Sequence, residues 1–151
     1  MNKKNILVSA CLLGVGCRYD GKGLPIERME QLLENFHPVP VCPEIMGGLT
    51  IPRRPCERVG DRVVNNAGED VTEQFVRGAE EALMLARLYD CKYALLKEKS
   101  PSCGYGKIYD GTFSHRVTDG SGVMAELLET EGIAVYGEND LDRFFREALR
   151  E

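Results

Sequence analysis

The chain has 151 residues, of which 43% are hydrophobic and 28% are charged. This composition is ordinary for a globular protein and excludes disordered, collagen-like and coiled-coil chains. The net charge of −5 excludes a general attraction to polyanions, and no apolar run is long enough to cross a membrane. We therefore expect a cytoplasmic protein with no nucleic-acid or membrane partner. For the oligomeric state, a monomer and a homodimer both stay open.

Short apolar runs alternate with amphipathic segments along the chain. The apolar runs predict strands at 6–8, 38–41, 93–96 and 133–136. Apolar residues at helical spacing predict helices at 26–36, 71–89, 121–131 and 139–150. Strands that alternate with helices predict a single α/β domain over residues 1–151, with a three-layer, Rossmann-like or flavodoxin-like architecture. The sheet of such a domain is mainly parallel and has helices on both faces.

The segment 71–89 carries the clearest helical signal. Asp70, followed by Glu73, resembles a capping box, in which a carboxylate accepts from the first free backbone amides. Gly78 lies inside the helix, where glycine costs about 1 kcal/mol relative to alanine. We expect this glycine to permit close packing against the sheet.

Two long connections, 43–70 and 98–120, interrupt the alternation. Loops of this length in a compact domain are usually functional or disordered. Each contains a hairpin signal: Gly60-Asp61 lies between two β-like runs, and Asp110-Gly111 is a favoured two-residue turn pair. These signals favour ordered, functional segments.

Cysteine is the most informative residue type in this chain. A cytoplasmic location keeps thiols reduced, which makes metal binding or catalysis a better explanation for them than disulfide bonds. Cys11, Cys42 and Cys103 each follow a predicted strand. Because ligands bind beyond the carboxyl ends of parallel strands, these three thiols are expected to converge on one centre.

The other three cysteines carry weaker signals. Cys91 follows the long helix and is expected to be a plain buried thiol. The same interpretation is favoured for Cys56. Cys17 stays undecided between a buried thiol and a functional group.

Cys11 with Arg18 also suggests a phosphatase-type nucleophile facing an anion. That loop needs five residues between cysteine and arginine, and here there are six, which disfavours the nucleophile. No CxxC pair occurs, which argues against zinc knuckles and ribbons. Three thiolates would suit zinc, copper(I) or an iron–sulfur cluster, and would leave one metal position open for substrate.

Polar residues near these cysteines suit an enzyme. Glu44 is two residues after Cys42, so on an extended segment it would point to the same side and could act as a general acid or base. Ser100 and Ser102 could donate hydrogen bonds to a substrate. The candidate cations for binding an anionic or carbonyl-bearing ligand are Arg18, Arg53, Arg54 and Lys97.

Several motifs, in this order along the chain, resemble one known family. They are SACLLG with CRYDG, VPVCPEIMGGL with PRRP, GEDVTEQFVRGA, and LKEKSPSCG with IYDGTF. The chain resembles the domain-of-unknown-function family DUF five-two-three, whose characterised members are thiouracil desulfidases.

The resemblance implies a [4Fe-4S] cluster held by Cys11, Cys42 and Cys103. It implies that the iron without a protein ligand binds the sulfur of a small thiolated compound such as 2-thiouracil, and that water replaces this sulfur without net redox change. It also places the acid/base carboxylate on Glu44 and the active-site serine on Ser100 or Ser102.

Two other classes of function stay open at this point. One is a non-catalytic module that binds a metal, an iron–sulfur cluster or sulfide through the same three thiolates. The other is an enzyme that uses Cys11 as its nucleophile.

Overall fold

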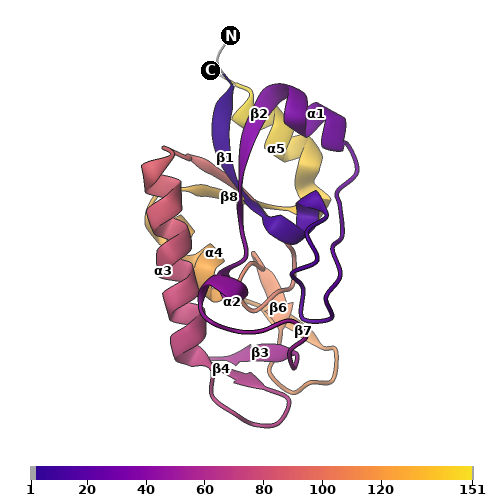
Figure 1. Ribbon diagram of the computed structural model, residues 1–151, viewed down its shortest axis with the longest axis vertical. Coiled ribbons are helices and arrows are strands. Elements are labelled where there is room, and N and C mark those ends of the chain that lie inside the picture. The colour runs from indigo at the N-terminus through magenta and orange to yellow at the C-terminus, as the bar shows by residue number, and fades with distance from the viewer. Residues whose placement is uncertain (1–2, 151) are drawn as a thin grey trace.

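A parallel four-stranded sheet forms the centre of the computed structural model, which describes residues 3–150 (Figure 1). The strands, in the order β2-β1-β5-β8, are β1 (Lys4–Ser9), β2 (Phe36–Val41), β5 (Tyr93–Leu96) and β8 (Ala134–Gly137). Taken in order of appearance, these strands run 2-1-3-4 across the sheet. This is the flavodoxin-like order without its fifth strand, so the predicted fold class is confirmed.

Helices cover both faces of this sheet. The α-helices are α1 (Met29–Asn35), α2 (Pro43–Met46), α3 (Thr72–Leu88), α4 (Val123–Thr130) and α5 (Leu141–Ala148), and the short 3-10 turns are η1 (Ala10–Leu13) and η2 (Glu138–Asp140). α3 and α4 pack on one face, and α1 and α5 on the other (Figure 1). Among residues 3–150, no helix combines the length and the hydropathy that a membrane span requires.

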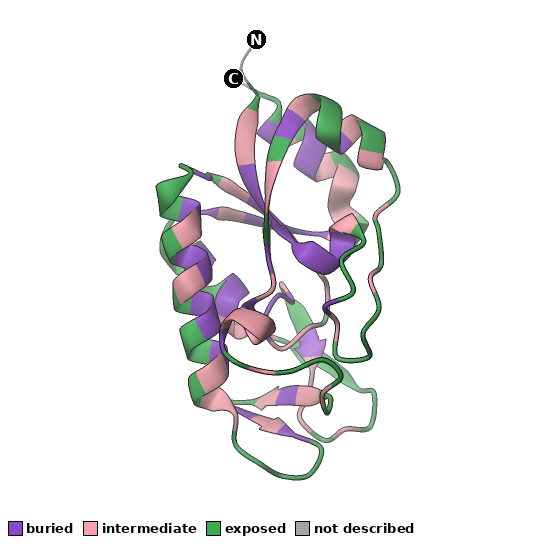
Figure 2. Ribbon diagram, in the orientation of Figure 1, coloured by how far each residue is buried: buried purple, intermediate pink, exposed green. Residues whose placement is uncertain are grey.

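The central strand β1 shows the burial on both faces that is typical of a parallel sheet. Ile6, Leu7 and Val8 are all fully buried, because helices cover both faces and leave no polar side. Leu7 belongs to the core beneath α3 and α4, and its two neighbours belong to the core beneath α1 and α5. Each such side chain contributes about 2 kcal/mol through burial. In Figure 2 this buried region runs through the middle of the sheet.

The predicted elements all occur, with ends that differ by a few residues. The largest difference is at the first helix, which begins at Met29 rather than at 26 and ends at Asn35, because Phe36 already pairs with Lys4 as the first residue of β2. The Asp70 carboxylate accepts from the Thr72 amide at 2.9 Å, at the start of α3.

Gly78 packs against α2 rather than against the sheet, which corrects the expectation. A Cβ atom at Gly78 would lie 1.8 Å from the Pro43 carbonyl oxygen. A Cβ atom at Gly47, at the end of α2, would lie 1.9 Å from the Gln74 carbonyl oxygen. The two glycines therefore let the backbones of α2 and α3 touch.

Both long connections contain a hairpin. Strands β3 (Cys56–Val59) and β4 (Arg62–Asn65) meet at the predicted Gly60-Asp61 turn. Strands β6 (Lys107–Tyr109) and β7 (Val117–Asp119) also pair, but the predicted two-residue turn at Asp110-Gly111 is wrong. The connection is a loop over 110–116, because two of its backbone amides bind the distant carboxylate of Glu57.

Candidate active site

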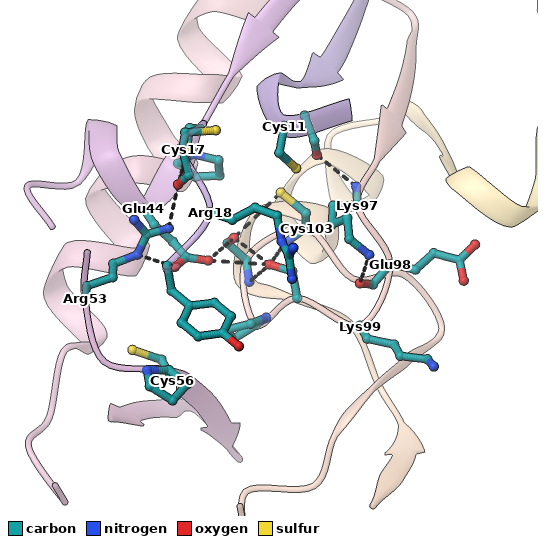
Figure 3. Close-up of a pocket in the computed structure, with 18 of the residues that line it drawn as sticks. Cys11, Cys17, Arg18, Glu44, Arg53, Cys56, Lys97, Glu98, Lys99 and Cys103 are labelled. Atoms are coloured by element: carbon teal, nitrogen blue, oxygen red, sulfur yellow. Dashed lines mark hydrogen bonds and ion pairs between the residues drawn. The ribbon is translucent and has the colours of Figure 1, made fainter. Parts of the chain in front are cut away.

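A cavity of about 360 Å³ lies beyond the carboxyl ends of β2, β1 and β5 (Figure 3). Its lining comes from segments within 9–19, 41–57 and 97–115. The order of the sheet reverses between β1 and β5, and ligands of open α/β sheets bind outside such a switch point. The volume falls within the range of small-molecule sites.

The three cysteines predicted to converge all line this cavity. Cys11 lies in η1 directly after β1, Cys42 directly follows β2, and Cys103 lies in the loop after β5. Because β2, β1 and β5 are adjacent, their ends bring the three thiols to one place. The sulfur atoms of Cys11 and Cys103 point toward one another in Figure 3.

Cys17 adds a fourth thiol to this group. The Cys42 thiol donates to the carbonyl oxygen of Cys17 at 3.7 Å, and the thiol of Cys17 itself interacts with those of Cys11 and Cys42. Cys56 lines the cavity as well, whereas Cys91 lies in the apolar core beneath α3 and α4. The plain buried thiol predicted for Cys91 is confirmed, and its burial raises its pKa to about 11.

The surroundings of two of these thiols, Cys103 and Cys42, oppose ionisation. Burial raises the pKa of Cys103 to about 12. The pKa of Cys42 is also raised, first by its hydrogen bond with Cys17 and then by burial. A thiol with a raised pKa is a poor nucleophile, and it needs a positive centre beside it to become a thiolate.

The donor set fits the expected [4Fe-4S] cluster. Sulfur ligands select iron–sulfur clusters, zinc or copper(I). Within residues 3–150, no three His, Cys, Asp or Glu side chains are grouped closely enough to hold one metal ion. A [4Fe-4S] cubane binds each cysteine through a different iron, so its ligands stand farther apart. Cys11, Cys42 and Cys103 could hold such a cluster at the base of the cavity.

Glu44 reaches the cavity from a helix, not from an extended segment as predicted. Pro43 opens α2, and its fixed φ suits the first helical position. The single turn of α2 brings Glu44 to Arg53, whose Nε lies 3.0 Å from Glu44 Oε1. Only 7% of the Arg53 side chain and 13% of the Glu44 side chain are exposed, so the pair is well shielded from water.

The two serines form a hydrogen-bonded chain to this carboxylate. The hydroxyl of Ser102 donates to Glu44 Oε2 at 2.9 Å and lies 2.9 Å from the hydroxyl of Ser100. Ser100 Oγ accepts from the amides of Ser102 and Cys103, each at 3.1 Å. Ser102 therefore contacts Glu44 at the shorter distance, and Ser100 lies 3.5 Å from it.

The predicted cations are near the cavity but have protein partners. Arg53 binds Glu44 and the carbonyl of Cys17, and the Lys97 ammonium lies 2.9 Å from Glu138 Oε1. Arg18 lines the cavity and pairs with Asp20 at 3.6 Å. Arg54 is exposed, binds Asn66 Oδ1 and does not line the cavity.

Sequence reasoning missed part of the lining, namely Lys99, Glu57, Tyr109 and His115. Tyr109 directly precedes the loop at 110–116 and His115 lies within it, and their rings form an edge-to-face pair with centroids 6.3 Å apart. The motif IYDGTF was the available signal, but its turn chemistry alone does not show that the loop faces the cavity.

Comparisons with known proteins show the family of this chain. The family model for 2-thiouracil desulfurase matches residues 6–140. A Bacillus subtilis (strain 168) protein described as uncharacterized protein YbbK is 42% identical over 147 residues, covering 91% of this chain and 97% of that protein. A solved structure of the [4Fe-4S]-dependent thiouracil desulfidase TudS is 44% identical, with a TM-score of 0.92 over 98% of this chain and 100% of that one. On the match over most of its residues, this chain belongs to the 2-thiouracil desulfurase family.

Proposed function

We propose that this protein is a [4Fe-4S]-dependent desulfidase that converts the C=S group of a small thiolated compound such as 2-thiouracil into C=O. One observation carries the proposal: Cys11, Cys42 and Cys103, which follow three adjacent strands, line the cavity that also holds Glu44. The TM-score of 0.92 with a thiouracil desulfidase supports it. Cys11, Cys42 and Cys103 are the proposed cluster ligands.

The reaction consumes one water and releases hydrogen sulfide without net oxidation or reduction. When bound, the cluster supplies a thiophilic Lewis acid that polarises the carbon–sulfur bond. Glu44 takes the proton from the water that attacks the carbon. The guanidinium of Arg53 balances the charge of this carboxylate in a site that excludes water.

The serine chain orients the carboxylate and moves the proton. Ser102 donates to Glu44 while the carboxylate is ionised, and it is close enough to Ser100 to pass a proton along the chain. Ser100 accepts hydrogen bonds from two backbone amides, which fix its position. The hydrogen-bonded serine chain is therefore ordered before substrate binds. Arg18, at the cavity wall, is the proposed contact for the substrate's polar edge. Arg53 acts there through Glu44, with which it forms an ion pair, whereas the Lys97 ammonium pairs with Glu138, which does not line the cavity.

Anaerobic purification tests the proposal. Wild-type protein should carry iron and acid-labile sulfide, and it should release sulfide and uracil from 2-thiouracil in equal amounts. Glu44→Gln should keep its iron but lose about 10²–10⁴-fold in turnover, the usual contribution of a general base. Cys42→Ala should lose iron and activity together.

A matched control separates cofactor loss from general damage. Cys91→Ala makes the same chemical change in the apolar core and should retain both iron and activity. Iron-loaded protein that releases no sulfide from any thioamide supports a binding module and contradicts the proposal. Colourless anaerobic protein whose activity disappears only in Cys11→Ser supports a cysteine nucleophile and also contradicts it.

A further inference from the structure

The loop at 110–116 contributes to the wall of the cavity. The amide of Asp110 donates to the carbonyl of Arg116 at 2.9 Å, which closes the loop at the end of the β6–β7 ladder. Tyr109, just before the loop, and His115, within it, both line the cavity. Their edge-to-face rings give this wall an aromatic surface with a hydroxyl and an imidazole.

A buried carboxylate from the other hairpin holds this loop. Glu57 in β3 is 8% exposed, and its Oε1 accepts from the amides of Gly111 at 2.9 Å and of Phe113 at 3.1 Å. Gly111 has φ +93°, and a Cβ atom there would lie 2.6 Å from Val59 Cγ2, so only glycine allows this approach to β3. One carboxylate thus ties together two hairpins that are far apart in sequence.

The loop also adopts an unfavourable backbone conformation that needs such support. Phe113 and His115 have φ values of 57° and 62°, in the left-handed region that side chains rarely occupy. Residues held this way cluster at functional sites, where the surrounding structure stabilises them. The two hydrogen bonds to Glu57 fix the loop on either side of Thr112, and the second of them holds Phe113, two residues before His115.

We propose that Glu57 is a positioning residue, which holds the 110–116 loop so that Tyr109 and His115 form the wall against which the ring of the substrate lies. This inference rests on the proposed function. A planar heteroaromatic ring suits the wall, because it can stack on or meet the edge of either side chain. The imidazole can also hydrogen-bond with the ring's N–H and carbonyl groups.

Steady-state kinetics of the cluster-loaded protein with 2-thiouracil test this role. Glu57→Leu keeps the size of the side chain but removes the acceptor, and it should raise KM about tenfold while kcat stays near that of wild type. Glu57→Gln retains an acceptor oxygen and should recover most of the affinity. His115→Ala should raise KM in the same way. Asp61→Ala, in the exposed turn of the same hairpin, is the matched control and should match wild type.

Limited proteolysis gives a readout that does not depend on turnover. Trypsin should cut after the exposed Arg116 faster in Glu57→Leu than in wild type or in Asp61→Ala. Bound 2-thiouracil should slow this cut in wild type and not in Glu57→Leu.

The outcomes separate the inference from the proposed function. Unchanged proteolysis in Glu57→Leu, faster proteolysis with an unchanged KM, or a lower kcat with an unchanged KM each overturns the positioning role. If wild type releases no sulfide, the proposed function fails. The inference is then decided by whether 2-thiouracil protects wild type, but not Glu57→Leu, from trypsin.

Discussion

Gly78→Ala should destabilise the protein and slow its reaction, although the same change in an exposed helix is stabilising. Alanine favours a helix over glycine by about 1 kcal/mol. Here, however, the new Cβ atom would lie 1.8 Å from the carbonyl oxygen of Pro43, which is about 1.5 Å short of van der Waals contact. Overpacking of this kind costs about 1–3 kcal/mol, so the net loss of unfolding free energy should be about 0–2 kcal/mol.

The larger effect should fall on turnover. To relieve the overlap, α2 must move away from α3, and Glu44 is the second residue of α2. A misplacement of about 1 Å at a reacting group can cost about 10²-fold in rate. Urea denaturation and sulfide release from 2-thiouracil measure the two effects. Glu80→Ala, on the exposed side of α3, is the control and should change neither.

One result would refute this reasoning. If Gly78→Ala gains about 1 kcal/mol in stability and keeps the wild-type rate, then α2 and α3 do not touch at their backbones. The close approach of Gly78 to Pro43 would then contribute nothing to stability or turnover.

Three further predictions concern the charges and thiols around and beyond the cavity. Cys17→Val should retain the iron content of wild type, measured after anaerobic purification, because the proposed ligands are the other three thiols of the group; loss of iron would make Cys17 a ligand. Arg53→Leu leaves the shielded Glu44 carboxylate without its partner and should lower the unfolding free energy in urea by about 3–5 kcal/mol. Adding Glu44→Gln to Arg53→Leu should recover part of the lost unfolding free energy. If the effects of the two substitutions simply add, the pairing of Arg53 with Glu44 is contradicted. Since burial raises the pKa of Cys91 to about 11, its alkylation by iodoacetamide in folded protein should be about two hundredfold slower at pH 8 than that of a free thiol with a pKa of about 8.5. The rate at Cys91 should be about tenfold faster at pH 9 than at pH 8. Mass spectrometry of the modified peptide measures this rate, and a rate that does not change with pH would contradict the assignment.

The sheet was predictable because its signals are local. A fully covered parallel strand needs a continuous apolar run, and residues 6–8 and 93–96 supply one without help from the rest of the chain. The carboxyl ends of such strands share one edge, so the meeting of Cys11, Cys42 and Cys103 could be inferred from their positions alone.

The parts that were missed depend on distant partners. α2 has four residues, too few to show helical periodicity, and its packing is set by Gly78 on another helix. The pair Asp110-Gly111 favours a tight turn locally, but Glu57 binds the loop amides and imposes a longer connection. In both cases a tertiary contact overrides the local preference.

The cavity is lined by segments that lie far apart in the sequence and are therefore synthesised at different times. Its first wall comes from residues 9–19 and its last from 97–115, and β5 must be inserted beside β1 before the two meet. A nascent chain that ends before residue 103 therefore exposes two of the convergent thiols with no pocket around them. A cluster held by all three thiols can therefore be completed only after residue 103 has been synthesised.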